Sequence, residues 1–246
     1  MSEEYGRDRV GAGEGQMVMP FYLVCDVSYS MVNDMAALND SLRRLKNAII
    51  AKPMVDDVAR ISIITFSDTA KVVMPLGHMG QQSVPTLSVE GGTDYGAAFR
   101  ELAHVIPADA ADLKAKGYKI FRPCAFFLTD GEPQNDKNTW QQTFKDTLTF
   151  DRATGVGLKQ YPVFVPIGFR AAPEDILRKL AYPLERGKWY HANSMTNVEQ
   201  ALNEIMSIIM KTVVSSGLSA SIKPALVHPT VTVSSGITQG DAEDWI

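Results

Sequence analysis

Short apolar runs alternate with amphipathic helical patterns along most of this chain. Apolar residues spaced three and four apart predict helices at residues 35–49 and 198–213. Further helices are expected at residues 94–105, about 139–148 and 173–180, the last because Pro, Glu and Asp suit a first turn. Runs rich in Val, Ile and Phe predict six strands, at 17–25, 58–66, 71–75, 122–128, 161–168 and 188–191. Strands that alternate with helices form βαβ units with right-handed crossovers, which build a parallel sheet.

The predicted fold class is α/β, with an open, doubly wound, mostly parallel six-stranded sheet of the Rossmann-like kind and helices on both faces. Only residues 67–70 separate the second strand from the third. A parallel crossover needs a dozen residues or more, so the third strand is expected to be an antiparallel edge strand. Residues 108–119 are expected to form a short helix or an irregular connection.

Both ends of the chain differ in composition from the part between them. Residues 1–16 are polar and contain glycine, which predicts a disordered N-terminal arm, and residues 17–215 carry the strand and helix patterns of one domain. Residues 216–246 are rich in Ser, Thr, Gly and Pro and lack a helical period, which predicts an extended or flexible C-terminal tail. Within it, residues 230–233 could pair with a sheet edge.

The composition is that of a soluble globular protein, and it argues against nucleic acid and membranes as partners. The chain has 246 residues, of which 45% are hydrophobic and 21% charged, and its formal net charge is −4, as in soluble proteins with their own core. Since there is no long basic run, nucleic acid is not an expected partner. No apolar stretch approaches membrane-spanning length and residues 1–16 lack a signal-peptide pattern, so no membrane association and a cytoplasmic location are expected.

The two cysteines, Cys25 and Cys124, each lie within a predicted strand. If the two strands end level with each other, the thiols are about 16 Å apart along the sheet at the usual rise per residue. A disulfide cannot span that distance. Two buried, reduced thiols are therefore expected.

Small oxygen-bearing side chains gather in three loops. Asp26, Ser28 and Ser30 follow the first predicted strand, Thr93 opens a predicted helix, and Asp130 follows the fourth strand. In open α/β sheets, ligands bind beyond the carboxyl ends of the strands. These five residues are therefore expected to converge on one binding face.

The chemistry of these five side chains favours a hard divalent cation. Two carboxylates and three hydroxyls offer only oxygen ligands, which suit Mg²⁺ or Mn²⁺. Because none of the three loops contains His or Cys, Zn²⁺ is disfavoured. Two carboxylates neutralise a divalent ion, and a carboxylate from a partner could then complete the metal shell.

These loops resemble the metal-ion-dependent adhesion site of von Willebrand factor type A domains. The likeness rests on Asp26-x-Ser28-x-Ser30, on Thr93 within Gly-Gly-Thr-Asp-Tyr-Gly, and on Asp130 within Leu-Thr-Asp-Gly-Glu-Pro, and it covers residues 17–215. It is nearest to the bacterial intracellular branch that includes the tellurite-resistance-associated TerY proteins. The resemblance implies that the three hydroxyls approach the metal, and that Asp26 and Asp130 bind it directly or through water.

The same resemblance implies a protein–protein interaction module and not an enzyme. A glutamate or aspartate of a partner protein would complete the metal shell, in a bacterial cytoplasmic signalling or stress-response assembly. The sequence defines no oligomeric state.

Two other functions stay open at the level of sequence. One is a metal-dependent phosphatase or hydrolase, although the second carboxylate of an aspartyl-nucleophile motif is replaced by Ser28. The other is a metal-independent scaffold with a vestigial site. Asp94 and Glu132 add negative charge beside the five residues. They either support the metal shell from behind or serve as ordinary helix-start and surface residues.

Overall fold

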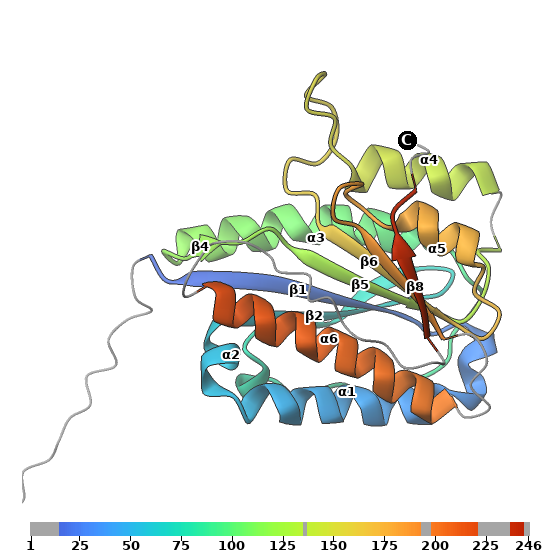
Figure 1. Ribbon diagram of the computed structural model, residues 1–246, viewed down its shortest axis with the longest axis horizontal. Helices are drawn as coiled ribbons and strands as arrows, with labels where there is room; N and C mark the ends of the chain where they lie inside the picture. The colour runs from blue at the N-terminus through green and yellow to red at the C-terminus, as the bar shows by residue number, and fades with distance from the viewer. Residues whose placement is uncertain (1–14, 135–136, 193–197, 221–236, 244–246) are drawn as a thin grey trace, which may run out of the picture.

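The computed structural model describes residues 15–134, 137–192, 198–220 and 237–243, and it contains one mixed sheet with helices on both faces (Figure 1). The strands are β1 (Met17–Asp26), β2 (Ala59–Phe66), β3 (Ala70–Gly77), β4 (Lys119–Ile120), β5 (Cys124–Thr129), β6 (Val163–Phe169), β7 (Lys188–Ala192) and β8 (Ile237–Asp241). The helices are α1 (Met35–Ile50), α2 (Pro53–Val58), α3 (Tyr95–Ala115), α4 (Lys137–Leu148), α5 (Glu174–Leu180) and α6 (Val198–Ala220), with short 3-10 turns η1 (Tyr29–Asn33) and η2 (Met79–Gln81).

The α/β fold class predicted from the sequence is confirmed. The strand order is β3-β2-β1-β5-β6-β7-β8, with β4 pairing to the beginning of β1. The central pairs are parallel, and β3 is antiparallel to β2, as expected from their short connection. The described part of the sheet has eight strands where six were predicted, because β4 and β8 were not anticipated.

The second unanticipated strand, β8, lies within the segment expected to be a tail. It pairs antiparallel with β7, so that each edge of the sheet ends in an antiparallel strand. The side chain of Asp241 forms an ion pair with Lys188, and Trp189 donates a hydrogen bond to the Asp241 carbonyl over 3.1 Å. Helix α6 also runs past residue 215, to Ala220.

Alternate residues of β1 face two separate hydrophobic layers. Phe21, Leu23 and Cys25 pack in the layer that contains residues of α1 and α6, whereas Tyr22 and Val24 pack in the layer beneath α3, α4 and α5. Figure 1 shows the same division, with α1, α2 and α6 on one side of the sheet and α3, α4 and α5 on the other. A strand that is buried on both faces has an unbroken apolar sequence, and this is why β1 could be predicted from the sequence.

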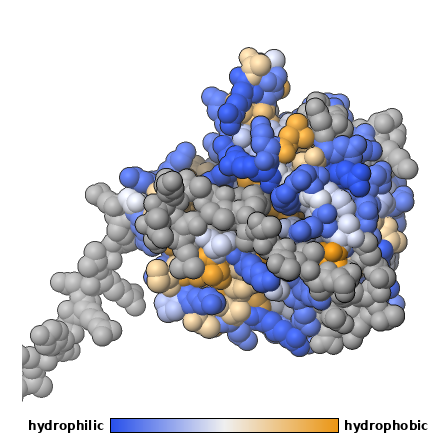
Figure 2. All heavy atoms as spheres, viewed as in Figure 1, coloured by the Kyte–Doolittle hydropathy of each residue, from blue (hydrophilic) through white to orange (hydrophobic). Residues whose placement is uncertain are grey.

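The outer surface of the helices is largely hydrophilic. Figure 2 shows one face of the molecule, where hydrophobic atoms gather near α2. Met54 in α2 is 61% exposed and Ile50 at the end of α1 is 40% exposed. Within the described residues, no helix is both long and apolar enough to cross a bilayer.

Both cysteines are free and buried, as predicted. In the register of β1 and β5, Cys25 lies opposite Leu128, and Cys124 lies opposite Phe21. The two thiols are therefore separated along the sheet by several residues, which excludes a disulfide.

The connection from β3 to α3 is fastened to α1 by one buried amide. Asn39 donates from Nδ2 to the Leu87 carbonyl (2.9 Å) and accepts from the Leu87 amide at Oδ1 (2.7 Å). Asn39→Ala would leave both backbone groups unpaired in a buried place, so we expect a loss of about 2 kcal/mol in the free energy of unfolding. Urea denaturation measures this change.

Asn47→Ala is the matched control, because Asn47 lies on the same helix but is exposed. Alanine is the better helix former, so the control should be neutral or slightly stabilising. Equal effects in the two variants would contradict the role assigned to Asn39.

Candidate metal centre

The carboxyl ends of β1 and β5 lie side by side, because Cys25 pairs with Leu128 in parallel register. The loops that carry Asp26 and Asp130 therefore emerge next to each other. The loop of Thr93 joins them through backbone hydrogen bonds: the Glu90 amide donates to the Val27 carbonyl (2.6 Å), and the Tyr29 amide donates to the Gly91 carbonyl (3.1 Å). The sheet thus brings all three predicted loops to one edge.

Asp26 is fully buried at the end of β1. Its Oδ1 accepts a hydrogen bond from the Ser28 amide (2.9 Å), and its Oδ2 accepts one from the Thr129 hydroxyl (2.8 Å). Both carboxylate oxygens are therefore fixed in direction by neighbouring donors. A rigid, partly hydrogen-bonded carboxylate is the form in which acidic side chains bind metals.

The two serines connect this loop to the other carboxylate. The hydroxyls of Ser28 and Ser30 lie 3.0 Å apart, and the Ser30 hydroxyl donates to Asp130 Oδ1 over 2.7 Å. Ser28 and Asp130 are buried, whereas Ser30 is exposed. Three of the predicted ligands thus form one chain of oxygen atoms that runs from the interior to the surface.

Thr93 is buried, with 5% of its surface exposed, between the first and third loops. Its carbonyl accepts a hydrogen bond from the Gln134 amide over 3.0 Å. The turn before it requires a glycine, since Gly91 has a φ of +51° and a Cβ there would lie 2.2 Å from the Asp68 carboxylate. The position of Thr93 therefore depends on backbone conformation as well as on hydrogen bonds.

The two carboxylates carry raised pKa values. Burial is the main cause of the increase in the pKa of Asp26 to about 6, the Asp130 charge adds to it, and the hydrogen bonds from Ser28 and Thr129 oppose it. Burial likewise raises the pKa of Asp130, while the hydrogen bond from Ser30 opposes the increase. Negative charge at this edge is thus costly in the absence of a cation.

Two residues behind Asp26 were not predicted from the sequence. Thr129 is fully buried and links Asp26 to the third loop. The Tyr95 hydroxyl lies 3.1 Å from the Thr129 hydroxyl and donates to the Gly131 carbonyl over 2.7 Å. Thr129 directly precedes Asp130 in the same motif, so its place in the sequence was a usable signal, whereas the role of Tyr95 depends on packing between α3 and β5.

An ion pair beside Asp130 was also not predicted. Asp34, whose side chain is 2% exposed, accepts two contacts from the Arg170 guanidinium: one from Nε over 2.5 Å and one from Nη2 over 2.7 Å. The Asp34 charge raises the pKa of Asp130, and the Arg170 charge lowers it. Arg170 has a φ of +55°, which is a strained backbone conformation for a residue other than glycine.

Asp94 has a structural role at the beginning of α3. Asp94 caps α3 by accepting a hydrogen bond from the Ala97 amide (3.1 Å), and it forms an ion pair with Arg100 (3.2 Å). Glu132 is exposed. The ordinary helix-start role is therefore the one that Asp94 has.

The donor set suits a hard cation. Within the described residues, no group of three or more His, Cys, Asp and Glu side chains is arranged to hold a metal. The oxygens at this edge come instead from two carboxylates and several hydroxyls. Such a mixture is compatible with Mg²⁺ or Mn²⁺, which take oxygen ligands and retain water.

The part of the sequence that carries these residues matches a known protein family. Residues 21–132 match the model of the von Willebrand factor type A domain. Within this span the chain is similar to a von Willebrand factor type A domain. The matched span includes all five predicted metal ligands, from Asp26 to Asp130. No curated protein gives a significant match to the sequence.

Several solved structures resemble the chain in fold. A von Willebrand factor type A protein from Catenulispora acidiphila has 13% identity and a TM-score of 0.54, with 80% of this chain and 43% of that one covered. A D319A mutant of the PilB minor pilin from Streptococcus sanguinis has 14% identity and a TM-score of 0.58, with 85% and 64% covered. At these identities the likeness is one of fold.

A third structure has a metal in its own adhesion site. Proximal thread matrix protein 1 from the mussel byssus, with a zinc-occupied metal-ion-dependent adhesion site, has 14% identity and a TM-score of 0.52, with 82% of this chain and 49% of that one covered. The present chain spans less than half the length of this protein and of the Catenulispora protein.

Proposed function

We propose that the carboxyl edge of the sheet binds a divalent cation, Mg²⁺ or Mn²⁺, through Asp26, Ser28, Ser30, Thr93 and Asp130. The observation that carries the proposal is the chain of oxygens from Ser28 through Ser30 to Asp130. It lies beside the buried carboxylate of Asp26, whose pKa is raised by burial. A cation would supply the positive charge that these two carboxylates lack.

We further propose that the bound metal docks an acidic residue of a partner protein. Two carboxylates balance a divalent ion, so a Glu or Asp of the partner would be the third negative ligand. Asp94 does not add to this charge, because it is paired with Arg100. Tyr29 and Val32, 69% and 59% exposed, lie in η1 next to Ser30 and offer apolar contact area around the metal.

The proposed role is binding and not catalysis. The neighbouring structures include a pilin and a thread matrix protein, both of which contain the same fold. The flanks of the three motifs resemble those of the bacterial intracellular branch, and for this reason we place the interaction in a cytoplasmic signalling or stress-response assembly of the tellurite-resistance kind.

The metal proposal predicts a specific effect of Ser30→Ala. Removing this hydroxyl deletes one ligand and frees Asp130 from its 2.7 Å hydrogen bond, so we expect the affinity for Mg²⁺ or Mn²⁺ to fall by roughly 10- to 100-fold. Calorimetric titration of the protein with each metal measures the change.

Ser83→Ala removes another exposed serine hydroxyl, outside the three loops, and should leave the affinity unchanged. Equal affinities of the wild type and Ser30→Ala would contradict the assignment of Ser30.

The docking proposal is tested separately, by capture of partners from a cell extract with and without chelator. Capture that is equal under both conditions would overturn docking through the metal.

A further inference from the structure

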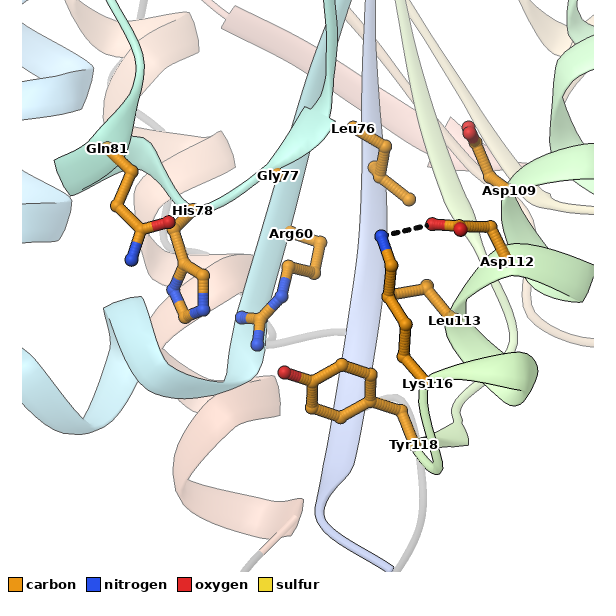
Figure 3. Close-up of a pocket in the computed structure, with 10 residues that line it drawn as sticks. All are labelled: Arg60, Leu76, Gly77, His78, Gln81, Asp109, Asp112, Leu113, Lys116 and Tyr118. Carbon is orange, nitrogen blue, oxygen red and sulfur yellow. Dashed lines mark hydrogen bonds and ion pairs between the residues drawn. The ribbon is translucent and has the colours of Figure 1, made fainter. Parts of the chain in front are cut away.

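A polar pocket of about 190 Å³ lies at the edge of the sheet opposite the candidate metal centre (Figure 3). Arg60 lies near the beginning of β2, whereas Asp26 pairs with Phe66 at the other end of that strand. The pocket is bounded on one side by β2, the end of β3 and η2, and on the other side by the second half of α3. The metal site and the pocket therefore share no residue.

Arg60 supplies a buried positive charge to this pocket. Only 3% of the residue is exposed. Its Nη1 donates to the carbonyls of Asp57 and Ala59, each over 3.0 Å, while its Nη2 is buried without a hydrogen-bond partner. The guanidinium lies over the Tyr118 ring at 5.3 Å, and it forms no ion pair with any carboxylate in the described part of the chain.

A buried guanidinium without a counter-ion is unusual in a folded protein. Burying a charge is unfavourable unless it is paired and hydrogen-bonded. Backbone carbonyls and an aromatic face compensate part of this charge, but they bring no negative charge. A ligand carboxylate on the Arg60 side of the pocket would bring it.

The opposite wall carries the acids. Figure 3 shows Asp109 and Asp112 on the α3 side and Arg60, His78 and Gln81 on the other side. Asp112 is neutralised by Lys116 at 2.7 Å. Asp109 has no ion pair among the described residues, and its Oδ2 accepts a hydrogen bond from the Tyr22 hydroxyl over 2.9 Å.

The pocket is therefore divided into a donor wall and an acidic wall. Arg60 is the unpaired cation of the first wall, and Asp109 is the unpaired acid of the second. A simple anion would satisfy Arg60 but would be repelled by Asp109. A simple cation would be attracted to Asp109 but repelled by Arg60. A ligand with both charges, held apart by a short carbon skeleton, would complement both walls.

We propose that this pocket binds a small amino carboxylate, of the class of free amino acids. Its carboxylate faces Arg60 and the side-chain amide of Gln81, and its ammonium group faces Asp109. Polar groups placed on opposite walls fix the orientation of such a ligand.

The test is calorimetric titration of the full chain, in chelator, with each of the twenty free L-amino acids, with acetate and with inorganic phosphate. We expect at least one amino acid to bind, and acetate and phosphate to bind at least tenfold more weakly. Asp109→Asn should weaken amino-acid binding about tenfold and leave acetate unchanged. Binding of phosphate in preference to every amino acid would overturn the proposal, as would no binding of any amino acid.

Two further variants distinguish a site from a structural effect. Gln81 is exposed at the pocket, so Gln81→Trp should block it and abolish binding without disturbing the core. Lys114→Gln is the control, because Lys114 lies in the last turn of α3, close to this pocket in sequence, but lines a different pocket. Amino-acid binding that survives Gln81→Trp, or that is lost in Lys114→Gln, would overturn the location.

Discussion

Asp26→Asn is expected to stabilise the metal-free protein at pH 7 and to abolish its response to Mg²⁺ or Mn²⁺. Asp26 is fully buried, and its pKa is raised from 3.8 to about 6, chiefly by burial. A shift of about two units corresponds to a cost of roughly 3 kcal/mol for the ionised form in the folded state. Asparagine has almost the same shape and removes that cost, but it also removes a charged metal ligand.

The pH dependence has a definite sign. Since the pKa of Asp26 is higher in the folded state than in the unfolded state, the folded protein binds more protons between about pH 4 and pH 6. The contribution of Asp26 to the free energy of unfolding is therefore greatest below pH 4, falls as the pH rises to about 6, and is constant above it. Metal binds the ionised carboxylate, so stabilisation by metal should grow over the same interval.

Urea denaturation in chelator, at intervals from pH 4 to pH 7, measures this profile for the wild type and the variant. Asp112→Asn is the control, because Asp112 is exposed and lies at the opposite edge of the sheet. It should change stability by less than about 0.5 kcal/mol. If Asp26→Asn still responds to metal, or if it has the same pH profile as the wild type, Asp26 is not the ligand that we propose.

The sequence predicted the buried strands better than the edges of the sheet. β1 and β5 are covered on both faces and are nearly all apolar, so their pattern is visible in the sequence alone. β8 reads Ile-Thr-Gln-Gly-Asp, with one apolar residue in five. Its place in the sheet comes from hydrogen bonds with β7, which no local pattern encodes.

Helix α3 shows a second kind of difference. It was predicted to end at residue 105, but it continues to Ala115 through Pro107. Proline removes one backbone hydrogen bond and normally interrupts a helix. Here the apolar face goes on past it, with Ile106, Ala110 and Leu113 all buried, and tertiary packing outweighs the local preference.

The candidate site also contains residues that the sequence predicted and residues that only the structure revealed. The five predicted ligands lie in short motifs at the ends of strands and helices, and the sheet topology brings their loops together. Arg170, by contrast, meets Asp34 across 136 residues of sequence and does so from a left-handed backbone conformation. Neither feature has a local signature, so the residue that balances the charge beside Asp130 was found only in the structure.

Arg170→Met is expected to lower the free energy of unfolding by about 3 kcal/mol. The substitution would leave the Asp34 carboxylate, 2% exposed, without its partner in a buried place. Breaking a buried ion pair from one side typically costs 3–5 kcal/mol. Arg170 itself is 44% exposed, and water can partly replace it, which puts the expected effect at the lower end of that range.

The double variant Asp34→Asn with Arg170→Met decides whether charge is the cause. It removes the unpaired carboxylate, so most of the lost stability should return, and the double-mutant cycle should give a coupling energy of about 2 kcal/mol. Arg43→Met is the matched control, since its ion pair with Asp40 is exposed at both ends, 53% and 58%, and should be worth less than about 0.5 kcal/mol. If the two arginine variants lose equal stability, or if the double variant is no more stable than Arg170→Met, the ion pair does not hold this edge of the sheet.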